Sequence, residues 1–151
     1  VLGLWEKPIG ADDSWRVPLD EVSHRIVELI EEWKPREVVF DPFAMMHAML
    51  QIEAVTGAHL IEYPQTPLRL VPACSQFAEL VLRRELAHDH HPALSRHVAN
   101  CHTKSDRHGV RIVKESRQSK RRIDAAVAAV MALDRALRLE PLVLPPKPKI
   151  Y

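Results

Sequence analysis

Short apolar strands alternate with helices through the first part of the chain, and this alternation constrains the fold more than any other feature. Apolar segments bounded by turn-forming residues predict strands at residues 1–5, 36–40 and 58–63. Apolar side chains at helical spacing predict helices between them, at residues 20–33 and 43–57. Such an alternation, with connections of only a few residues, is typical of crossover units on a mainly parallel sheet. The sequence therefore predicts an α/β domain.

The second half of the chain is less regular and ends in its clearest helix. The pattern predicts a proline-punctuated loop at residues 64–72, helices at 73–87 and 92–101, and one more strand around 110–112. Residues 123–137 carry an apolar stripe flanked by alanines. Because alanine is small, we expect this last helix to lie close to the sheet.

Composition fits one domain over residues 1–140, followed by an extended, Pro-rich tail at residues 141–151. The 21 Lys and Arg residues nearly cancel the 20 Asp and Glu residues, so the net charge of +1 does not by itself indicate a nucleic-acid partner. Two cysteines without CxxC spacing are typical of a reduced intracellular protein. No apolar run approaches the roughly 20 residues that span a bilayer. An opening inside an apolar stretch, without Met, indicates a fragment of a longer polypeptide.

Two aspartates stand where an α/β domain presents reactive groups. Asp41 follows the apolar strand VVF, and parallel sheets bind ligands at the carboxyl ends of their strands. Asp124 lies in the first turn of the last helix, where the helix dipole favours a negative charge. Each also has an ordinary explanation, as a turn initiator and as a helix-start acid. If the last helix packs across the strand ends, both carboxylates can share one cation, and two or three carboxylates with open water positions are how Mg²⁺ or Mn²⁺ is held for phosphodiester chemistry.

A local excess of positive charge precedes Asp124. It consists of Lys114, Arg117, Lys120, Arg121 and Arg122. Such runs are often only solvated faces. Beside a metal-binding acid, however, the run can hold DNA phosphates near the cation without reading their sequence.

Histidines offer a competing interpretation. Several lie in the segment LAHDHHP, and His97, Cys101 and His102 follow at near-helical spacing, which allows a zinc site. The spacing matches no standard zinc module. A non-catalytic DNA- or protein-binding module, stabilised by zinc, therefore stays open as the alternative from a different class of function.

Four segments, in this order, resemble the nuclease domain of phage terminase large subunits. They are the strand end VVFDP, the segments YPQTPLRLVPACSQFAELV and ELAHDHHPALSRHVANCHTK, and the basic run with its helix, KESRQSKRRIDAAVAAVMALDRAL. The resemblance covers residues 15–137, and IDAAVAAVMA after basic residues is its most specific part. It implies an RNase H-like fold, a mainly parallel or mixed sheet flanked by helices, which lacks its first strands in this chain.

The resemblance also implies a two-metal endonuclease site. In the family, the strand-end acid and the acid of the last helix are metal ligands, which carries over to Asp41 and Asp124. The family's third acid lies on the first strand, and no residue here matches it. We therefore expect activity in the parent polypeptide and weak or no cutting by this piece. His88 and the pair His97 and Asn100 match residues that the family tends to keep, and we expect them at the rim of the site or in packing.

Expectations about the parent protein follow from the same resemblance. Terminase nucleases cut concatemeric double-stranded phage DNA at the start and end of packaging. The expected partners are double-stranded DNA, the small terminase subunit and the portal of the procapsid. We expect no membrane association, oligomers only in the full-length motor, and the cytoplasm of an infected or lysogenic bacterial host as the location. The chain has no P-loop, so we expect no motor activity from it. A resolvase or transposase core stays open as an alternative RNase H-like nuclease.

Overall fold

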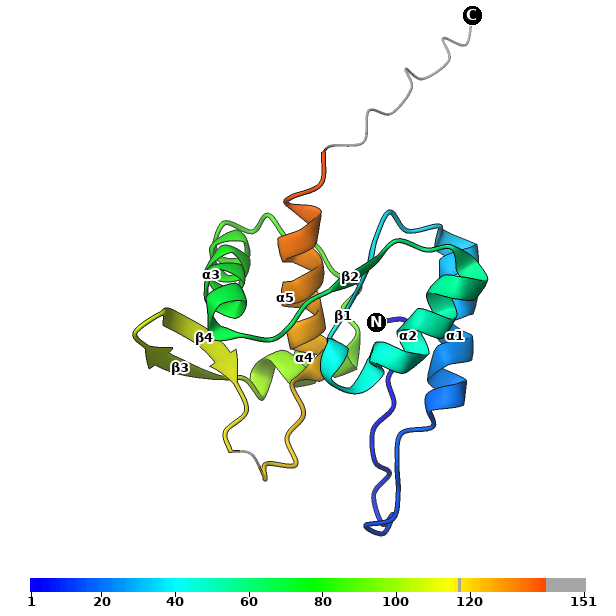
Figure 1. The fold of residues 1–151 in the computed structure, drawn as a ribbon. Coiled ribbons are helices and arrows are strands. Elements are labelled where there is room, and N and C mark those ends of the chain that lie inside the picture. Colours follow the sequence, from blue (N-terminus) through cyan, green and yellow to red (C-terminus); the bar gives the residue numbers. More distant parts are fainter. Residues whose placement is uncertain (117, 141–151) are drawn as a thin grey trace, which may run out of the picture.

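The computed structural model describes residues 1–116 and 118–140, and these residues form an α/β fold (Figure 1). In chain order the elements are α1 (Leu19–Trp33), β1 (Val38–Phe40), α2 (Pro42–Thr56), β2 (Leu60–Glu62), α3 (Pro67–Leu82), α4 (Pro92–Ala99), β3 (His102–Asp106), β4 (Gly109–Val113) and α5 (Asp124–Ala136). The predicted α/β class is confirmed. None of the described helices is both long and apolar enough to cross a membrane.

The strands of the described residues form two separate pairs. β1 and β2 are parallel, with Val38 opposite Leu60 and Phe40 opposite Glu62, and α2 makes the crossover between them. This is the parallel unit that the sequence predicts. β3 and β4 form an antiparallel hairpin, in which Gly109 takes the positive φ of 121° that a residue without Cβ adopts readily.

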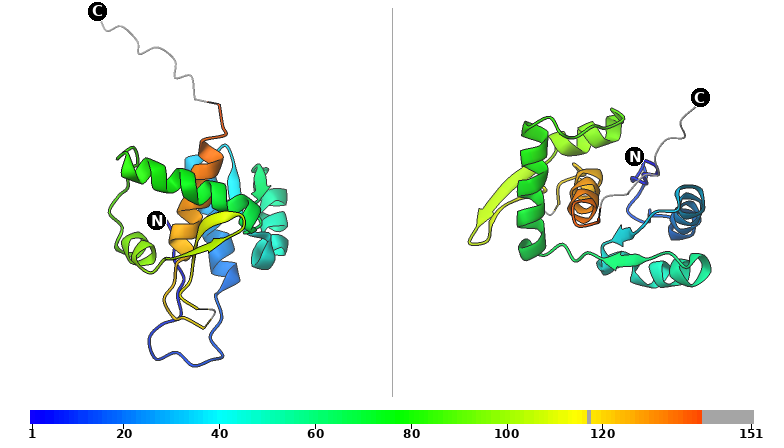
Figure 2. Two further views of the ribbon diagram at one scale, coloured as in Figure 1. Left: turned by 90° about the vertical axis from the view of Figure 1, so that its left-hand side faces the viewer. Right: turned by 90° about the horizontal axis from the view of Figure 1, so that it is seen from above.

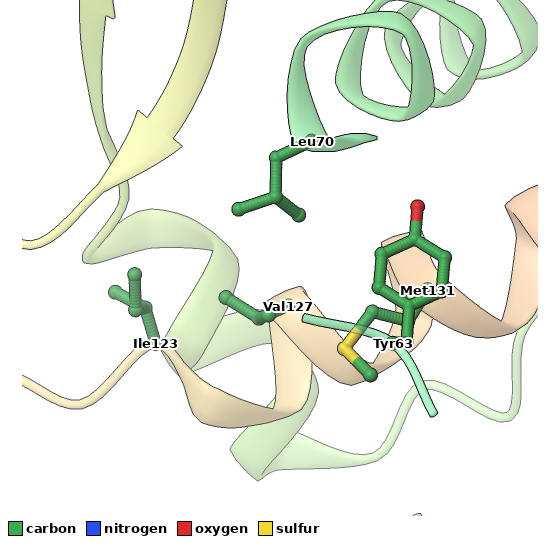
Figure 3. Close-up of a cluster of buried hydrophobic side chains, with 5 residues drawn as sticks. All are labelled: Tyr63, Leu70, Ile123, Val127 and Met131. Atoms are coloured by element: carbon green, nitrogen blue, oxygen red, sulfur yellow. The ribbon is translucent and has the colours of Figure 1, made fainter. Parts of the chain in front are cut away.

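Helix α5 stands at the centre of the molecule. Viewed along its axis, it is surrounded by α1 and the β1–β2 unit on one side and by α3, α4 and the hairpin on the other (Figure 2). One buried cluster joins it to α3 and to the residue after β2, and consists of Tyr63, Leu70, Ile123, Val127 and Met131 (Figure 3). A second contact with α3 uses the small side chains Ala73 and Cys74 against Val130. The alanine-rich helix therefore lies between the two sheets and close to another helix.

A second apolar cluster holds the other half of the molecule together. Ile30 of α1, Phe40 of β1, and Met49 and Ile52 of α2 are buried against one another. The position of β1, and therefore of the residue that follows it, is fixed from both sides by this cluster and by α5.

A buried polar contact fixes α5 beside the end of β2. The Tyr63 hydroxyl donates a hydrogen bond of 2.9 Å to Oδ2 of Asp134, and Arg138 donates to Oδ1 at 2.8 Å. The side chain of Asp134 is only 4% exposed. Burial and the neighbouring Asp134 carboxylate raise the pKa of Tyr63 to about 12.

The structure differs from the local predictions in three places. Residues 1–5 form no strand, and residues 67–72, predicted as loop, are the start of α3. Pro67 occupies the first turn of that helix, where a missing N–H costs nothing. Pro72 lies inside it, and burial of Leu70, Val71, Ala73 and Cys74 offsets the lost hydrogen bond. The strand β3 is not predicted, because its residues are mostly exposed and polar and it forms by pairing with β4. Arg117 and the predicted tail at 141–151 lie outside the described residues.

Candidate functional site

Asp41 lies at the carboxyl end of β1, where its side chain is held by two hydrogen bonds. It is the N-cap of α2, and its Oδ1 accepts from the backbone N–H of Phe43 at 3.1 Å. Its Oδ2 accepts from Nε2 of Gln65 at 2.7 Å. Gln65 follows β2, and parallel strands end at the same edge of a sheet, so the pairing of β1 with β2 brings these two side chains together.

Asp124 is the first residue of α5, and its side chain is 66% exposed. The preceding residue, Ile123, is buried in the central cluster and anchors the beginning of the helix. Nζ of Lys114, at the end of β4, lies 3.9 Å from Oδ1 of Asp124. A negative charge at this position interacts favourably with the helix dipole and with this ammonium group.

The beginning of α5 lies beside the carboxyl end of β1 (Figure 1). Asp41, Gln65, Lys114 and Asp124 line the same cleft, which has a volume of about 1160 Å³. Its walls are largely apolar and come from β1, β4 and the face of α5 that carries Val127 and Met131, among others. The structure thus brings the two predicted aspartates, far apart in sequence, to one cavity. A largely apolar wall that carries a small number of polar groups is the usual makeup of a binding site.

The donor set of the cleft suits a hard divalent cation. Carboxylate oxygens with room for water are the preferred ligands of Mg²⁺ and Mn²⁺, whereas zinc sites use His and Cys. Across residues 1–116 and 118–140, no three His, Cys, Asp or Glu side chains converge in the way a protein-only metal cage requires. Asp41 and Asp124 could therefore supply two ligands, with further positions open to water or substrate oxygens.

The basic residues lie on the loop that leads from β4 into α5. Lys120, Arg121 and Arg122 are exposed, while Lys114 is half-buried in the cleft. The placement of Arg117 is outside the described residues. The exposed cations therefore precede Asp124 closely along the chain and do not line the cleft themselves.

The three residues expected at the rim or in packing have different environments, and none of them lines the cleft. His88 is exposed, with its ring centroid 4.5 Å from that of His90. The side chain of His97 is fully buried and bonded to Glu6 and to the backbone of Ala125. Asn100 donates to the backbone carbonyl of Arg122 at 2.9 Å. His97 and Asn100 thus contact the backbone at the beginning of α5 without lining the cleft.

Comparison with known protein families decides between the alternatives that share this architecture. Residues 8–140 match the family described as the terminase large subunit, endonuclease domain. The chain belongs to this family. The predicted resemblance is therefore confirmed, and the match places the domain with terminase endonucleases rather than with resolvases or transposases. A comparison with curated proteins gave no match.

The fold of this terminase endonuclease domain is also that of a solved structure, the HK97 bacteriophage large terminase. The TM-score is 0.66 at 24% sequence identity, over 79% of this chain. The chain matches 25% of the length of that protein, so the likeness is to one part of it. It supports the RNase H-like architecture.

The zinc alternative finds no support in the geometry of the domain. The His97 ring nitrogens are both engaged within the protein, and Sγ of Cys101 donates to the carbonyl of His97 at 3.2 Å. Burial raises the pKa of the Cys101 thiol, which disfavours the thiolate that binds zinc. The described histidines and cysteines do not converge on one point.

Gln65 is the residue of the cleft that the sequence does not single out. The prediction assigns it to a loop. One signal was available, because Gln65 follows the second strand of the parallel pair closely, as Asp41 follows the first. A polar residue soon after each of two paired strands is a stronger indication of a site than either residue alone.

Proposed function

We propose that this domain is the nuclease module of a phage or prophage DNA-packaging terminase, and that it cuts double-stranded concatemeric DNA by metal-dependent hydrolysis. The observation that carries the proposal is that Asp41 and Asp124 line one cleft, beside Lys114. Membership of the terminase endonuclease family supports DNA cutting in general. Metal dependence and the two-metal mechanism rest on the chemistry of the two carboxylates.

Asp41 and Asp124 would hold Mg²⁺ or Mn²⁺, with two ions in the parent protein. Bound there, the ions would activate water and stabilise the leaving oxygen of the phosphodiester. Gln65 holds Oδ2 of Asp41 by its 2.7 Å hydrogen bond and so limits rotation of that carboxylate. A further acid, from the first strand of the family's domain, would complete the site. We therefore expect full activity in the parent polypeptide and weak activity in this chain.

The basic residues would hold the DNA backbone beside the carboxylates. Lys120, Arg121 and Arg122 are exposed next to Asp124, and Arg117 belongs to the same run. Cations that contact phosphates give affinity without sequence preference, and this affinity falls steeply with salt. Lys114, 3.9 Å from Asp124, would in addition meet a phosphate that enters the cleft.

The proposal also covers the partners, the location and the oligomeric state of the parent protein. The parent protein would work with the small terminase subunit and the portal of a procapsid, in the cytoplasm of the infected or lysogenic host. Oligomers would form only in the full-length motor.

The experiment that tests the proposal is plasmid cutting in Mn²⁺ by the chain and by a polypeptide extended upstream. Asp41→Asn and Asp124→Asn remove one charge each with almost no change in shape. We expect each to lower cutting by at least about 100-fold, as is typical when a metal ligand or transition-state stabiliser is lost. The matched control is Asp13→Asn, which changes an exposed acid outside the cleft that pairs with Lys7.

Two outcomes would contradict the proposal. Cutting that survives both substitutions would mean that the site lies elsewhere. DNA binding without cutting by the extended polypeptide, in Mg²⁺ and in Mn²⁺, would favour the non-catalytic binding module. Thermal melting of each variant, expected to match the parent polypeptide within a few degrees, excludes unfolding as the cause of lost activity.

A further inference from the structure

His97 is a buried histidine whose two ring nitrogens both have partners. It belongs to α4, and its side chain is completely inaccessible to solvent. Its Nδ1 lies 2.9 Å from the backbone nitrogen of Ala125, the second residue of α5. Its Nε2 lies 2.8 Å from Oε1 of Glu6. A buried ring with both nitrogens used is held in one orientation.

The partners determine which nitrogen carries the proton. The N–H of Ala125 can only donate, so Nδ1 must be the acceptor and must lack a proton. The proton is therefore on Nε2, which donates to Glu6. Glu6 is well suited to accept it, because its hydrogen bond with His97 and the nearby guanidinium of Arg96 lower the pKa of its carboxyl. The three groups form a chain from a carboxylate through a histidine to a helix terminus.

These hydrogen-bonded groups give α5 the N-terminal cap that its own sequence does not provide. The first N–H groups of a helix have no partner within the helix, and a polar side chain at the N-cap usually accepts from one of them. The N-cap of α5 is Ile123, which makes no side-chain hydrogen bond. His97 provides the missing acceptor from another helix. Asn100, the C-cap of α4, donates to the carbonyl of Arg122 at 2.9 Å.

We propose that His97, hydrogen-bonded to Glu6 and assisted by Asn100, is a positioning residue that fixes the backbone from which the Asp124 carboxylate enters the cleft. Asp124 lies between Arg122 and Ala125, and both of these backbone units are bonded to α4. The residue therefore has little freedom to move with a fraying helix end. This inference rests on the proposed function, in which Asp124 binds the metal ion.

Two substitutions at residue 97 separate the cap from simple packing. His97→Asn keeps an acceptor atom where Nδ1 stands, next to Ala125, and removes the hydrogen bond to Glu6. His97→Gln keeps a donor where Nε2 stands and removes the acceptor. Both reduce the side-chain volume at a buried site, so both lower the melting temperature. A purely structural role predicts that other properties follow the melting temperature, whereas the positioning role predicts that the two variants differ.

The first measurement is NMR on the 151-residue chain without metal. We expect long-range ¹H–¹⁵N spectra to show the proton of His97 on Nε2. We expect the backbone order parameter of Asp124 to be near the rigid value of about 0.85 in the parent chain and in His97→Asn, and to fall below about 0.6 in His97→Gln. His88→Gln, at an exposed histidine, is the matched control and should change nothing at Asp124. A proton on Nδ1, or an Asp124 that stays rigid in His97→Gln, would overturn the inference.

The second measurement is Mn²⁺ binding, followed by electron paramagnetic resonance on the same chain. Loss of a residue that orients a metal ligand typically costs about 10- to 100-fold in affinity, and we expect a decrease in this range for His97→Gln and a much smaller one for His97→Asn. Asp124→Asn separates the two hypotheses. If it leaves Mn²⁺ binding unchanged, the proposed function fails; if it abolishes binding while His97→Gln does not weaken it, the positioning role fails.

Discussion

Replacing Tyr63 by Phe should destabilise the domain in a pH-dependent way. The substitution removes only the hydroxyl that donates to Oδ2 of Asp134 at 2.9 Å, and the ring stays in the central cluster. Asp134 keeps its hydrogen bond with Arg138 but is left with one partner fewer in a site where it is 4% exposed. A hydrogen bond to a charged group contributes about 1.5–3 kcal/mol, and we expect the free energy of unfolding to fall by this amount near neutral pH.

The raised pKa of Tyr63 has two main causes, burial of the side chain first and the hydrogen bond to Asp134 second, so the hydrogen bond accounts for only part of the shift. A change from 10.0 to about 12 corresponds to about 2.7 kcal/mol. Because the pKa is higher in the folded state, this contribution is present in full below pH 10.0 and is lost as the pH rises through about 12. The difference in stability between the parent chain and Tyr63→Phe should therefore shrink over that range.

The assay is urea unfolding of both chains at a series of pH values from about 8 to about 12, followed by circular dichroism. Titration of lysines and other groups affects both proteins equally, so the difference between them isolates Tyr63. A difference that stays constant across the series would refute the reasoning, because it would mean that Tyr63 ionises as easily in the folded state as in the unfolded state. No difference near neutral pH would refute the hydrogen bond itself.

Two further predictions concern DNA binding and the second apolar cluster. Combined alanine substitution of the exposed cations Lys120, Arg121 and Arg122 should weaken the salt dependence of binding to duplex DNA, measured by fluorescence anisotropy. The slope of log affinity against log salt should fall by up to about 3, close to 0.9 for each phosphate that is no longer neutralised. An unchanged slope would mean that these cations do not contact the DNA. Met49→Ala should lower the free energy of unfolding by about 2–5 kcal/mol, because Met49 is 1% exposed. The control Leu50→Ala, at a 53% exposed position of the same helix, should lower it by about 0.5 kcal/mol or less. Equal effects of the two substitutions would contradict the assignment of Met49 to the buried cluster.

Elements with strong periodicity could be predicted from the sequence, and elements that depend on a partner could not. The apolar stripes of α1 and α5 and the runs at β1 and β2 mark segments that bury one face or both, so the local pattern determines the structure. β3 reads His-Thr-Lys-Ser-Asp and is mostly exposed, so nothing in its own residues favours a strand. It exists because β4 pairs with it through the turn at Gly109. Prolines at the beginning of α3 likewise fit either a loop or the first turn of a helix, and only the burial of neighbouring side chains in the folded domain decides between the two.

The same distinction between local pattern and tertiary contact applies to the candidate site. Asp41 and Asp124 could be selected because the end of a strand and the beginning of a helix are local features. The metal-binding role of the pair remains a prediction. Their meeting in one cleft depends on α5 standing beside β1, which is a tertiary contact. Gln65 and His97 are important for the same reason: each contacts an aspartate, or the residue next to it, from a different element.

The arrangement of α5 suggests why its far end matters for a site at its beginning. Arg135, near the C-terminus of the helix, donates two hydrogen bonds of 2.9 and 2.7 Å to Glu37, which directly precedes β1. Asp41 directly follows the same strand. The helix that carries Asp124 and the strand that carries Asp41 are therefore joined at the end opposite to the two carboxylates, while His97 and Asn100 hold the near end of the helix. Loss of the Arg135–Glu37 contact would remove one of the interactions that set the angle between the two elements, and we expect the separation of the carboxylates to change with it. Under the proposed function, a cation shared by Asp41 and Asp124 would be sensitive to that separation, so the Arg135–Glu37 pair would affect cutting without supplying a metal ligand.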